Sequence, residues 1–283
     1  MPAKEAPDDT QRPLFGSAPE PRVPLAPRSS PPSTSRNERD INPNRTGPVR
    51  PPATNGHRAN IKVASLNIRG RSCAAMGTGP ISKWATVSKA LCTCQIRILA
   101  IQETHLSTEL ASQAGELFTR RLTIYNSPDP VNPTGSAGVA FVVNKEKVDT
   151  SGITMTALIQ GRAIFLSVPR KHDHNLHIIN IYAPNDLSHH VDFWAEVTTQ
   201  WLAKRLPTPH LMMGDFNLVE DPLDRAPARA NNTAATAALR TCRQTLNLQD
   251  IWRQNFPGEC LFTYTSPHNT LSRIDRIYAN PAV

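Results

Sequence analysis

Short apolar segments that end in polar turns recur from residue 61 to residue 283, and they constrain the fold more than any other feature. Some alternate apolar and polar residues, as half-buried strands do, and others are continuous apolar runs typical of buried strands. Hairpin-like strands interleaved with a few helices predict an α/β domain of packed mixed sheets. The strands are predicted at 61–68, 97–103, 138–144, 153–160, 163–169, 176–184 and 210–217, with short ones near 262–265 and 272–279.

Four helices are predicted from apolar residues at helical spacing. Ser107 is a candidate N-cap for a helix at 107–122, because a serine side chain accepts hydrogen bonds from the first turn. In the helix at 188–206, one face carries Val191, Trp194, Val197 and Trp201, and we expect this face to pack on the core. The other two helices are predicted at 82–92 and 231–246.

The first 60 residues have a different composition from the rest of the chain. Half of the 26 prolines lie there, together with scattered arginines and few periodic apolar residues. Such a segment buries too little surface to offset the entropy of ordering, so we predict that residues 1–60 are disordered. It is either a plain linker or a weak basic tether to nucleic acid. The folded domain is predicted to span residues 61–283.

The charge balance favours an anionic partner. The formal net charge is +8 and the sequence pI is about 9.5. A basic surface of this kind suits nucleic acid, although a generic basic surface explains the charge equally well. We expect the chain to act as a monomer.

The lack of a recognisable secretion signal or membrane span in the sequence predicts an intracellular protein, nuclear or cytoplasmic, rather than a secreted or membrane protein. The N-terminus has no apolar signal core. No apolar run approaches the ~18 residues that a membrane span needs. The five cysteines are odd in number and irregularly spaced, which argues against a disulfide framework. We interpret them as small buried hydrophobic residues.

Polar side chains fall where the predicted strands leave the core. If these strands are neighbours, their ends form one patch with three carboxylates, which repel one another unless a cation compensates. Oxygen ligands without thiolates or clustered imidazoles favour Mg²⁺ or Mn²⁺ over zinc. Taken singly, each residue has a structural alternative, such as a helix cap or a turn former. The residues are Asn67, Glu103, Tyr182, Asn185, Asp215, Asn217 and Asp275.

Five motifs in this order resemble the endonuclease/exonuclease/phosphatase superfamily, which includes DNase I and the abasic-site endonucleases. They are SLNIRG, IQET, IYAPN, GDFN and SRID. The segment LQDIWRQNFPGE, followed by Thr263 and Tyr264, is similar to the apurinic-like endonuclease domain of non-LTR retrotransposon proteins. The resemblance implies a DNase I-like fold, a four-layered sandwich of two mixed β-sheets flanked by helices. It also implies a divalent-metal-dependent phosphodiester hydrolase that nicks DNA, and contact with element RNA through the full-length parent protein. Endonuclease domains of this kind are associated with reverse transcriptases, but the sequence does not say whether one follows here.

The resemblance assigns roles to the matching residues. Glu103 would be the main metal ligand, with Asn67 beside it and Asp275 completing the acidic cluster. Asp215 would orient or deprotonate the attacking water, and Tyr182 would donate to the scissile phosphate or the leaving oxygen.

Further residues would contact the substrate. Asn217 would hold a phosphate oxygen, and Asn185 would shape the same loop. Thr263 belongs to the same expected substrate-binding set. Arg69 and Arg273 are candidate phosphate contacts, although surface arginines without a role are equally consistent with the sequence.

The sequence departs from the family after SRID. Members carry one more strand and a serine–aspartate–histidine motif there, whereas this sequence ends at Val283 and none of its nine histidines fits that place. His189 and His190 open a predicted helix, where exposure or capping is expected. A positioned acid–base group contributes about 10²–10⁴-fold to a rate, so we expect this chain to be a weak or inactive nuclease. The alternatives are a nucleic-acid-binding pseudo-nuclease and a phosphatase of the same fold.

Overall fold

The computed structural model describes residues 61–70, 80–170 and 174–282. The chain divides into two units, residues 1–56 and 57–283, and all described residues belong to the second unit. The predicted disorder of residues 1–60 therefore lies outside the described residues.

The first half of the domain forms a four-stranded sheet in the order β1-β2-β4-β3. Strands β1 (Val63–Asn67) and β2 (Ile98–Gln102) run parallel. Strands β3 (Leu122–Ser127) and β4 (Val139–Asn144) are antiparallel to their neighbours. Helices α1 (Pro80–Thr93) and α2 (Thr108–Leu117) pack on the outer face, where Trp84, Leu91, Leu99 and Leu122 are among the buried residues.

The second half forms a five-stranded sheet in the order β12-β8-β7-β6-β5. Two helices, α3 (His190–Ala203) and α4 (Thr233–Thr245), cover its outer face. Strand β8 is parallel to β7 and antiparallel to β12. The strands are β5 (Thr154–Ile159), β6 (Ala163–Val168), β7 (Leu176–Tyr182), β8 (Leu211–Asp215) and β12 (Asp275–Ala279).

Smaller elements surround the end of the second sheet. A three-stranded sheet has the order β10-β11-β9, and helix α5 (Ile251–Asn255) lies near β12. The strands of this small sheet are β9 (Arg225–Ala226), β10 (Tyr264–Thr265) and β11 (Leu271–Ser272). Short 3-10 helices occur at Leu187–His189 and Pro222–Asp224.

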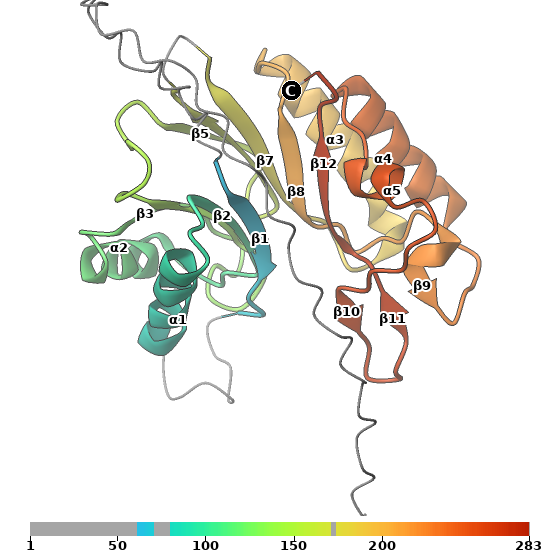
Figure 1. Ribbon diagram of the computed structural model, residues 1–283, viewed down its shortest axis with the longest axis horizontal. Coiled ribbons are helices and arrows are strands. Elements are labelled where there is room, and N and C mark those ends of the chain that lie inside the picture. The colour runs from blue at the N-terminus through green and yellow to red at the C-terminus, as the bar shows by residue number, and fades with distance from the viewer. Residues whose placement is uncertain (1–60, 71–79, 171–173, 283) are drawn as a thin grey trace, which may run out of the picture. The chain divides into compact units, whose positions relative to one another are not determined.

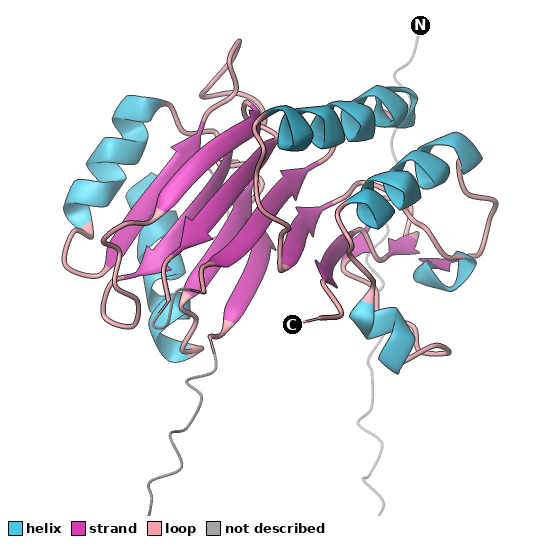
Figure 2. Cartoon of the chain, turned by 90° about the horizontal axis from the view of Figure 1, so that it is seen from above, coloured by secondary structure: helices cyan, strands magenta, loops and turns pink. Residues whose placement is uncertain are grey.

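The two large sheets face each other, with helices on both outer faces (Figures 1 and 2). A core that includes Phe141, Ile164, Ile178 and Met213 fills the space between them. Strand β7 alternates accordingly: Ile178 contacts this inner core, whereas Ile179 and Ile181 contact the core under α3 and α4. The predicted four-layered sandwich is confirmed.

Most predicted elements are present, and their differences from the sequence analysis have local causes. Ser107 caps α2 through a bond from the Leu110 amide, but the helix ends at Leu117, because Leu122 already belongs to strand β3. The face of α3 that packs on the core carries Trp194 and Val197 as predicted.

Two expectations about burial were wrong. Val191 is 44% exposed, while the adjacent His190 is fully buried because its ring finds polar partners inside. Of the described cysteines, Cys242 is buried, whereas Cys94 and Cys260 are exposed. Among the described residues, no helix is both long and apolar enough to cross a bilayer.

A buried amide pair joins the two large sheets. Asn180 of β7 donates to the Ile101 carbonyl at 3.0 Å and to the Ala140 carbonyl at 2.9 Å. Its Oδ1 accepts a 2.6 Å bond from Gln102 Nε2 of β2. Both side chains are completely buried. Because every bond crosses from one sheet to the other, this contact fixes how the sheets are aligned.

We expect Asn180→Ala to lower the free energy of unfolding by about 2–4 kcal/mol, because it removes three buried hydrogen bonds and leaves their partners unpaired. Urea unfolding of the full chain measures this change. The exposed Asn175, just before β7, is the control, and Asn175→Ala should change stability by less than about 0.5 kcal/mol. Equal effects of the two substitutions would show that the bridge does not hold the sheets together.

Candidate active site

Strand register gathers most of the predicted residues at one end of the sheets. In the second sheet, Tyr182, Asp215 and Asp275 form one row, because Asp215 is the register partner of both others. In the first sheet, Asn67 pairs with Gln102, so Glu103 leaves the sheet beside Asn67. The ends of the facing sheets therefore bring five polar side chains together.

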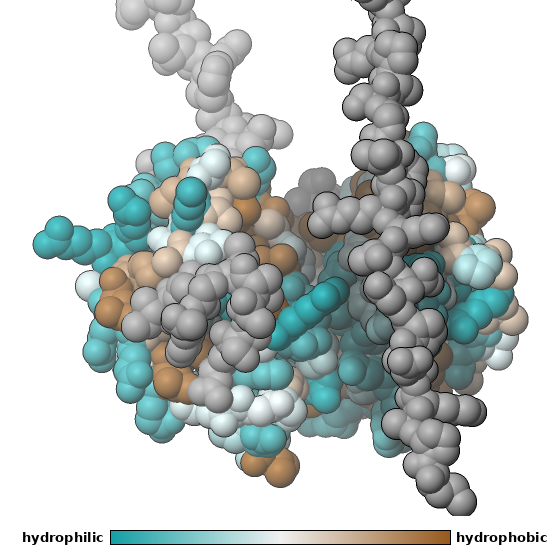
Figure 3. Space-filling view, turned by 90° about the horizontal axis from the view of Figure 1, so that it is seen from below, coloured by the Kyte–Doolittle hydropathy of each residue, from teal (hydrophilic) through white to brown (hydrophobic). Residues whose placement is uncertain are grey.

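These ends line a pocket of about 890 Å³. The β10–β11 hairpin forms one wall of it, through residues 264–267. Figure 3 shows the molecule from this end, and the central surface that the grey atoms leave visible is mostly hydrophilic. The predicted site residues that line the pocket are Asn67, Arg69, Glu103, Asn185, Asp215, Asn217, Thr263 and Asp275.

The amide of Asn67 lies between two carboxylates. Its Nδ2 donates to Glu103 Oε1 and to Asp215 Oδ2, both at 2.9 Å. Tyr182 Oη donates to the same Glu103 oxygen at 3.0 Å. The Asn67 Oδ1 atom accepts from the Arg69 amide at 2.9 Å. Asn67 thus acts here as a donor that links the carboxylates of the two sheets.

A second amide network orders the loops after β7 and β8. The backbone N–H of Asn217 donates to Asp215 Oδ1 at 2.9 Å. Its side-chain Nδ2 donates to the Ala183 carbonyl at 3.0 Å and to Asn185 Oδ1 at 2.9 Å. These bonds fix the Asp215 carboxylate and hold the Asn185 side chain at the pocket.

The backbone at the site is unusually constrained. Arg69, Glu103 and Asn217 have φ angles of 51°, 53° and 45°, in the left-handed region that residues other than glycine rarely adopt. Gly214 has φ 143°, and a Cβ there would collide with the Ile181 backbone of β7. Strained backbone of this kind is common at active sites, where the surrounding structure maintains it.

Burial and like charges shift the acidity of the site. Burial, followed by the charge of Asp275, raises the pKa of Asp215 to about 7, against the hydrogen bonds from Asn67 and Asn217. Burial also raises the pKa of Asp275. Burial and the nearby Glu103 raise the pKa of Tyr182, so its hydroxyl stays protonated and able to donate. With a pKa of about 7, the Asp215 carboxylate can exchange a proton near neutral pH.

The donor set suits a hard cation with few protein ligands. Within the described part of the chain, no three acidic, histidine or cysteine side chains gather closely enough to enclose a metal ion. The sequence analysis expected carboxylates with amides between them, and the Asn67 amide does lie between Glu103 and Asp215. Mg²⁺ commonly takes one or two carboxylates and completes its shell with water and substrate oxygens, so the site fits this ion.

Three more residues were predicted to contact the substrate, and two of them, Arg69 and Thr263, lie at the pocket. Arg69 lines the pocket, with its guanidinium carbon 5.9 Å from the Tyr264 ring centroid. Thr263 Oγ1 accepts from the backbone amides of Ile274 and Asp275 at 3.1 and 3.0 Å, so it also anchors Asp275.

Arg273 does not reach the pocket. Its side chain is buried and forms ion pairs with Asp224 at 2.9 Å and Asp250 at 2.6 Å. The expectation that Arg273 contacts a substrate phosphate does not fit this position. Its charge is neutralised inside the protein, so we do not include it among the substrate contacts.

Two features of the site were missed from the sequence. The guanidinium carbon of Arg162 lies 4.8 Å from the Tyr182 ring centroid, and the hairpin residues 264–267 form a pocket wall. Arg162 lies in a turn between β5 and β6, and no local pattern indicated its contact. The aromatic residue beside Thr263 was the available signal for the hairpin.

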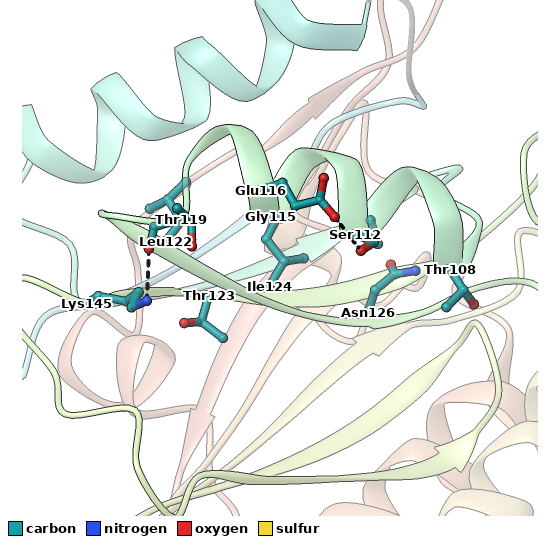
Figure 4. A pocket seen from close by; sticks show the side chains of 11 residues that line it. Thr108, Ser112, Gly115, Glu116, Thr119, Leu122, Thr123, Ile124, Asn126 and Lys145 are labelled. Atoms are coloured by element: carbon teal, nitrogen blue, oxygen red, sulfur yellow. Dashed lines mark hydrogen bonds between the residues drawn. The ribbon is translucent and has the colours of Figure 1, made fainter.

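A second pocket, of about 500 Å³, lies between α2 and β3 (Figure 4). Its polar contacts are local: Ser112 bonds to Glu116 at 3.4 Å, and Lys145 donates to the Thr119 carbonyl at 2.9 Å. None of the predicted site residues lines it.

The chain belongs to the Endonuclease/Exonuclease/phosphatase family, which matches residues 64–283. This match confirms the resemblance seen in the motifs. As its name states, this family comprises nucleases and phosphatases, which hydrolyse phosphate esters.

A curated relative is the "Transposon TX1 uncharacterized 149 kDa protein" of Xenopus laevis. It is 27% identical over 186 residues, which are 63% of this chain and 13% of that protein. This chain therefore spans a small part of its relative's length.

Solved structures share the fold at low sequence identity. An AP endonuclease from Archaeoglobus fulgidus has a TM-score of 0.60 and 17% identity, over 79% of this chain and 88% of that one. The 3′ phosphatase NExo from Neisseria, bound to a product DNA hairpin, has a TM-score of 0.60, 18% identity and the same coverage. The endonuclease domain of TRAS1, a telomere-specific non-LTR retrotransposon, has a TM-score of 0.53 and 13% identity, over 79% of this chain and 86% of that one.

The raised pKa of Asp215 predicts a pH-dependent stability without divalent ions. In the folded state the pKa is about 7, above the ordinary 3.8 of an unfolded aspartate, so this group favours folding at low pH. That contribution is lost as the pH rises through about 7. Between pH 5 and pH 8, the wild type should therefore lose about 2–3 kcal/mol more unfolding free energy than Asp215→Asn, because the asparagine does not titrate.

Urea unfolding in EDTA at the two pH values measures this difference. The exposed Asp149 lies away from the pocket, and Asp149→Asn should follow the wild-type pH dependence. If Asp215→Asn also follows it, the carboxylate is not destabilised in the folded state.

Proposed function

We propose that this chain is a divalent-metal-dependent phosphodiester hydrolase that nicks DNA. The observation that carries the proposal is that Asp215 and Asp275 of one sheet and Asn67 and Glu103 of the other line one pocket, with Tyr182 bonded to Glu103 beside it. Metal-assisted phosphodiester hydrolysis uses a base for water, donors for the phosphoryl oxygens and a site for a cation, and this set would supply all three.

Glu103 and Asp275 would hold the cation, most simply Mg²⁺ or Mn²⁺. A bound divalent ion supplies charge stabilisation at the phosphoryl oxygens and lowers the pKa of coordinated water. Asn67 would contribute through its amide group. In the present geometry this group points its nitrogen at the carboxylates, so using the oxygen requires the amide to turn over.

Asp215 would accept the proton of the attacking water. Its carboxylate is fixed by donors from Asn67 and Asn217, and its raised pKa suits a base working near neutrality. Asn217 would hold a phosphate oxygen by exchanging one of its two present Nδ2 bonds, to Ala183 or Asn185, and Asn185 would shape the same loop. Tyr182 would donate its hydroxyl proton to a phosphate oxygen or to the leaving group, because its raised pKa keeps it protonated.

DNA is the proposed substrate for three reasons. The net charge of +8 favours a polyanion, and Arg69 brings a cation to the pocket. Proteins of the same fold include AP endonucleases and a retrotransposon endonuclease domain. The curated relative is a transposon protein, which supports a role in cutting target DNA for a mobile element.

We expect Asp215→Asn to lower the rate of supercoiled-DNA nicking by about 10²–10⁴-fold, because it removes the proton acceptor while keeping the shape. Glu103→Gln should instead raise the Mg²⁺ concentration needed for activity and abolish the thermal stabilisation that Mg²⁺ gives the wild type. Nicking and thermal unfolding, each titrated with Mg²⁺ and reversed by EDTA, measure these effects.

The matched control is Glu146→Gln, at an ion pair on the surface, which should behave as wild type. Nicking that persists in EDTA, or equal activity of the three variants, would refute the proposed chemistry. DNA binding without cleavage in any form would instead identify a binding module.

The two arginines predict opposite phenotypes. Arg69→Ala should weaken DNA binding at all sequences and reduce the slope of log affinity against log salt by about one, as expected for a lost phosphate contact. Arg273→Ala should leave the slope unchanged and lower the unfolding free energy by about 3–5 kcal/mol, because it leaves buried acids unpaired. Fluorescence anisotropy over a salt series and urea unfolding test this pair. A changed slope in Arg273→Ala alone would reverse the assignment.

A further inference from the structure

His190 is buried behind the candidate active site, at the first residue of α3. Its Nε2 lies 2.8 Å from the Pro184 carbonyl oxygen. Its Nδ1 accepts a 3.3 Å bond from the indole Nε1–H of Trp194. The contact with Pro184 links the helix to the loop that follows β7, and the contact with Trp194 lies within the helix.

The partners determine the state of the ring. An indole N–H can only donate and a carbonyl oxygen can only accept. His190 must therefore be neutral, with its proton on Nε2. A second proton on Nδ1 would face the Trp194 N–H, so the imidazolium form cannot keep both bonds.

Pro184 occupies the centre of the loop that carries Asn185. On one side, the Ala183 amide donates to the Asp215 carbonyl at 2.9 Å. On the other side, Asn185 accepts from Asn217. Pro184 has no N–H of its own, so its carbonyl is the backbone polar group through which this residue can bond to the helix.

Trp194 extends the same connection to Asp215. Its ring stacks on Phe216, with centroids 5.7 Å apart and planes 17° apart. Phe216 directly follows Asp215, and its amide donates to the Ile274 carbonyl at 2.9 Å, next to Asp275. His190 thus contacts Pro184, in the loop after β7, and Trp194, which packs on Phe216 after β8.

We propose that His190 is a positioning residue of the proposed hydrolase: its neutral ring bridges Trp194 to Pro184 and so holds Asn185 against Asn217. This inference rests on the proposed function for its kinetic consequences. The geometric part concerns the free protein and is testable without catalysis.

The surroundings keep His190 neutral near physiological pH. Burial lowers its pKa, with a smaller lowering by His189, while the Pro184 carbonyl and the nearby Asp186 act in the opposite direction. Protonation below the ordinary histidine value of about 6.5 would break the bridge to Trp194 and release the loop.

Three substitutions separate the bridge from mere packing. His190→Gln keeps a hydrogen-bond donor and an acceptor but does not titrate, whereas His190→Leu removes both the donor and the acceptor. Trp194→Phe keeps an aromatic ring on Phe216 and removes the donor to Nδ1, which should raise the pKa of His190. His189→Gln is the matched control, because the neighbouring His189 side chain is 70% exposed.

The first measurement is an NMR pH titration of the full chain, following the side-chain amides of Asn185 and Asn217 and the Trp194 indole N–H. In wild type and His189→Gln, these signals should shift together at acid pH. The shift should vanish in His190→Gln and move to higher pH in Trp194→Phe. In His190→Leu, the Asn185 signal should be displaced at every pH.

The second measurement is the pH profile of Mg²⁺-dependent DNA nicking. His190→Leu should lower kcat by about 10–100-fold, as expected when a support of a reacting group is lost. His190→Gln should stay within about threefold of wild type at neutral pH and lose one acid limb of the profile.

The idea is overturned if His190→Leu leaves both the Asn185 signal and kcat unchanged, even if it lowers the melting temperature. It is also overturned if His190→Gln titrates like wild type. If no form of the chain cuts DNA, the proposed function fails, and the NMR titration still decides whether His190 holds the loop.

Discussion

The buried contact between Asn180 and Gln102 sets the geometry on which the candidate active site depends. Glu103 follows Gln102 directly, and Tyr182 lies two residues beyond Asn180 on the same face of β7. The hydrogen bond from Tyr182 to Glu103 therefore repeats, at the sheet end, the alignment that the amides impose inside. A slip of β7 by one residue would turn Tyr182 toward α3 and separate these partners.

Alternation in single strands was sufficient to predict packed mixed sheets, and the polar strand ends predicted a common patch if the strands are neighbours. The four layers were predicted from the family resemblance. The prediction from sequence failed where local regularity breaks. Arg273 and Asp275 have strand-like spacing in SRID, but β11 ends at Ser272 and β12 begins at Asp275. The two residues between these strands let Arg273 turn inward to Asp224. Alternation cannot predict that turn.

His190 illustrates a related limit. Hydropathy favours Val191 for the inner face of α3, and both choices fit helical spacing. The buried histidine is acceptable because Pro184 and Trp194 satisfy both ring nitrogens. Those partners come from another loop and from the next helical turn, so only the folded chain reveals them.

The catalytic and metal-binding roles of the pocket residues remain predictions that the proposed variants test.

The buried ion-pair network around Asp224 changes how the charge of this protein is understood. Four arginines (243, 253, 273 and 276) turn inward and pair with Glu220, Asp224 and Asp250. A count of the 31 lysines and arginines includes these four as though a polyanion could meet them, but three acids cancel most of their charge at short range. The proposed attraction for nucleic acid would therefore come from the other basic residues, so the distribution of positive charge matters more than its total. Two homologues of equal pI could differ widely in the field that surrounds them.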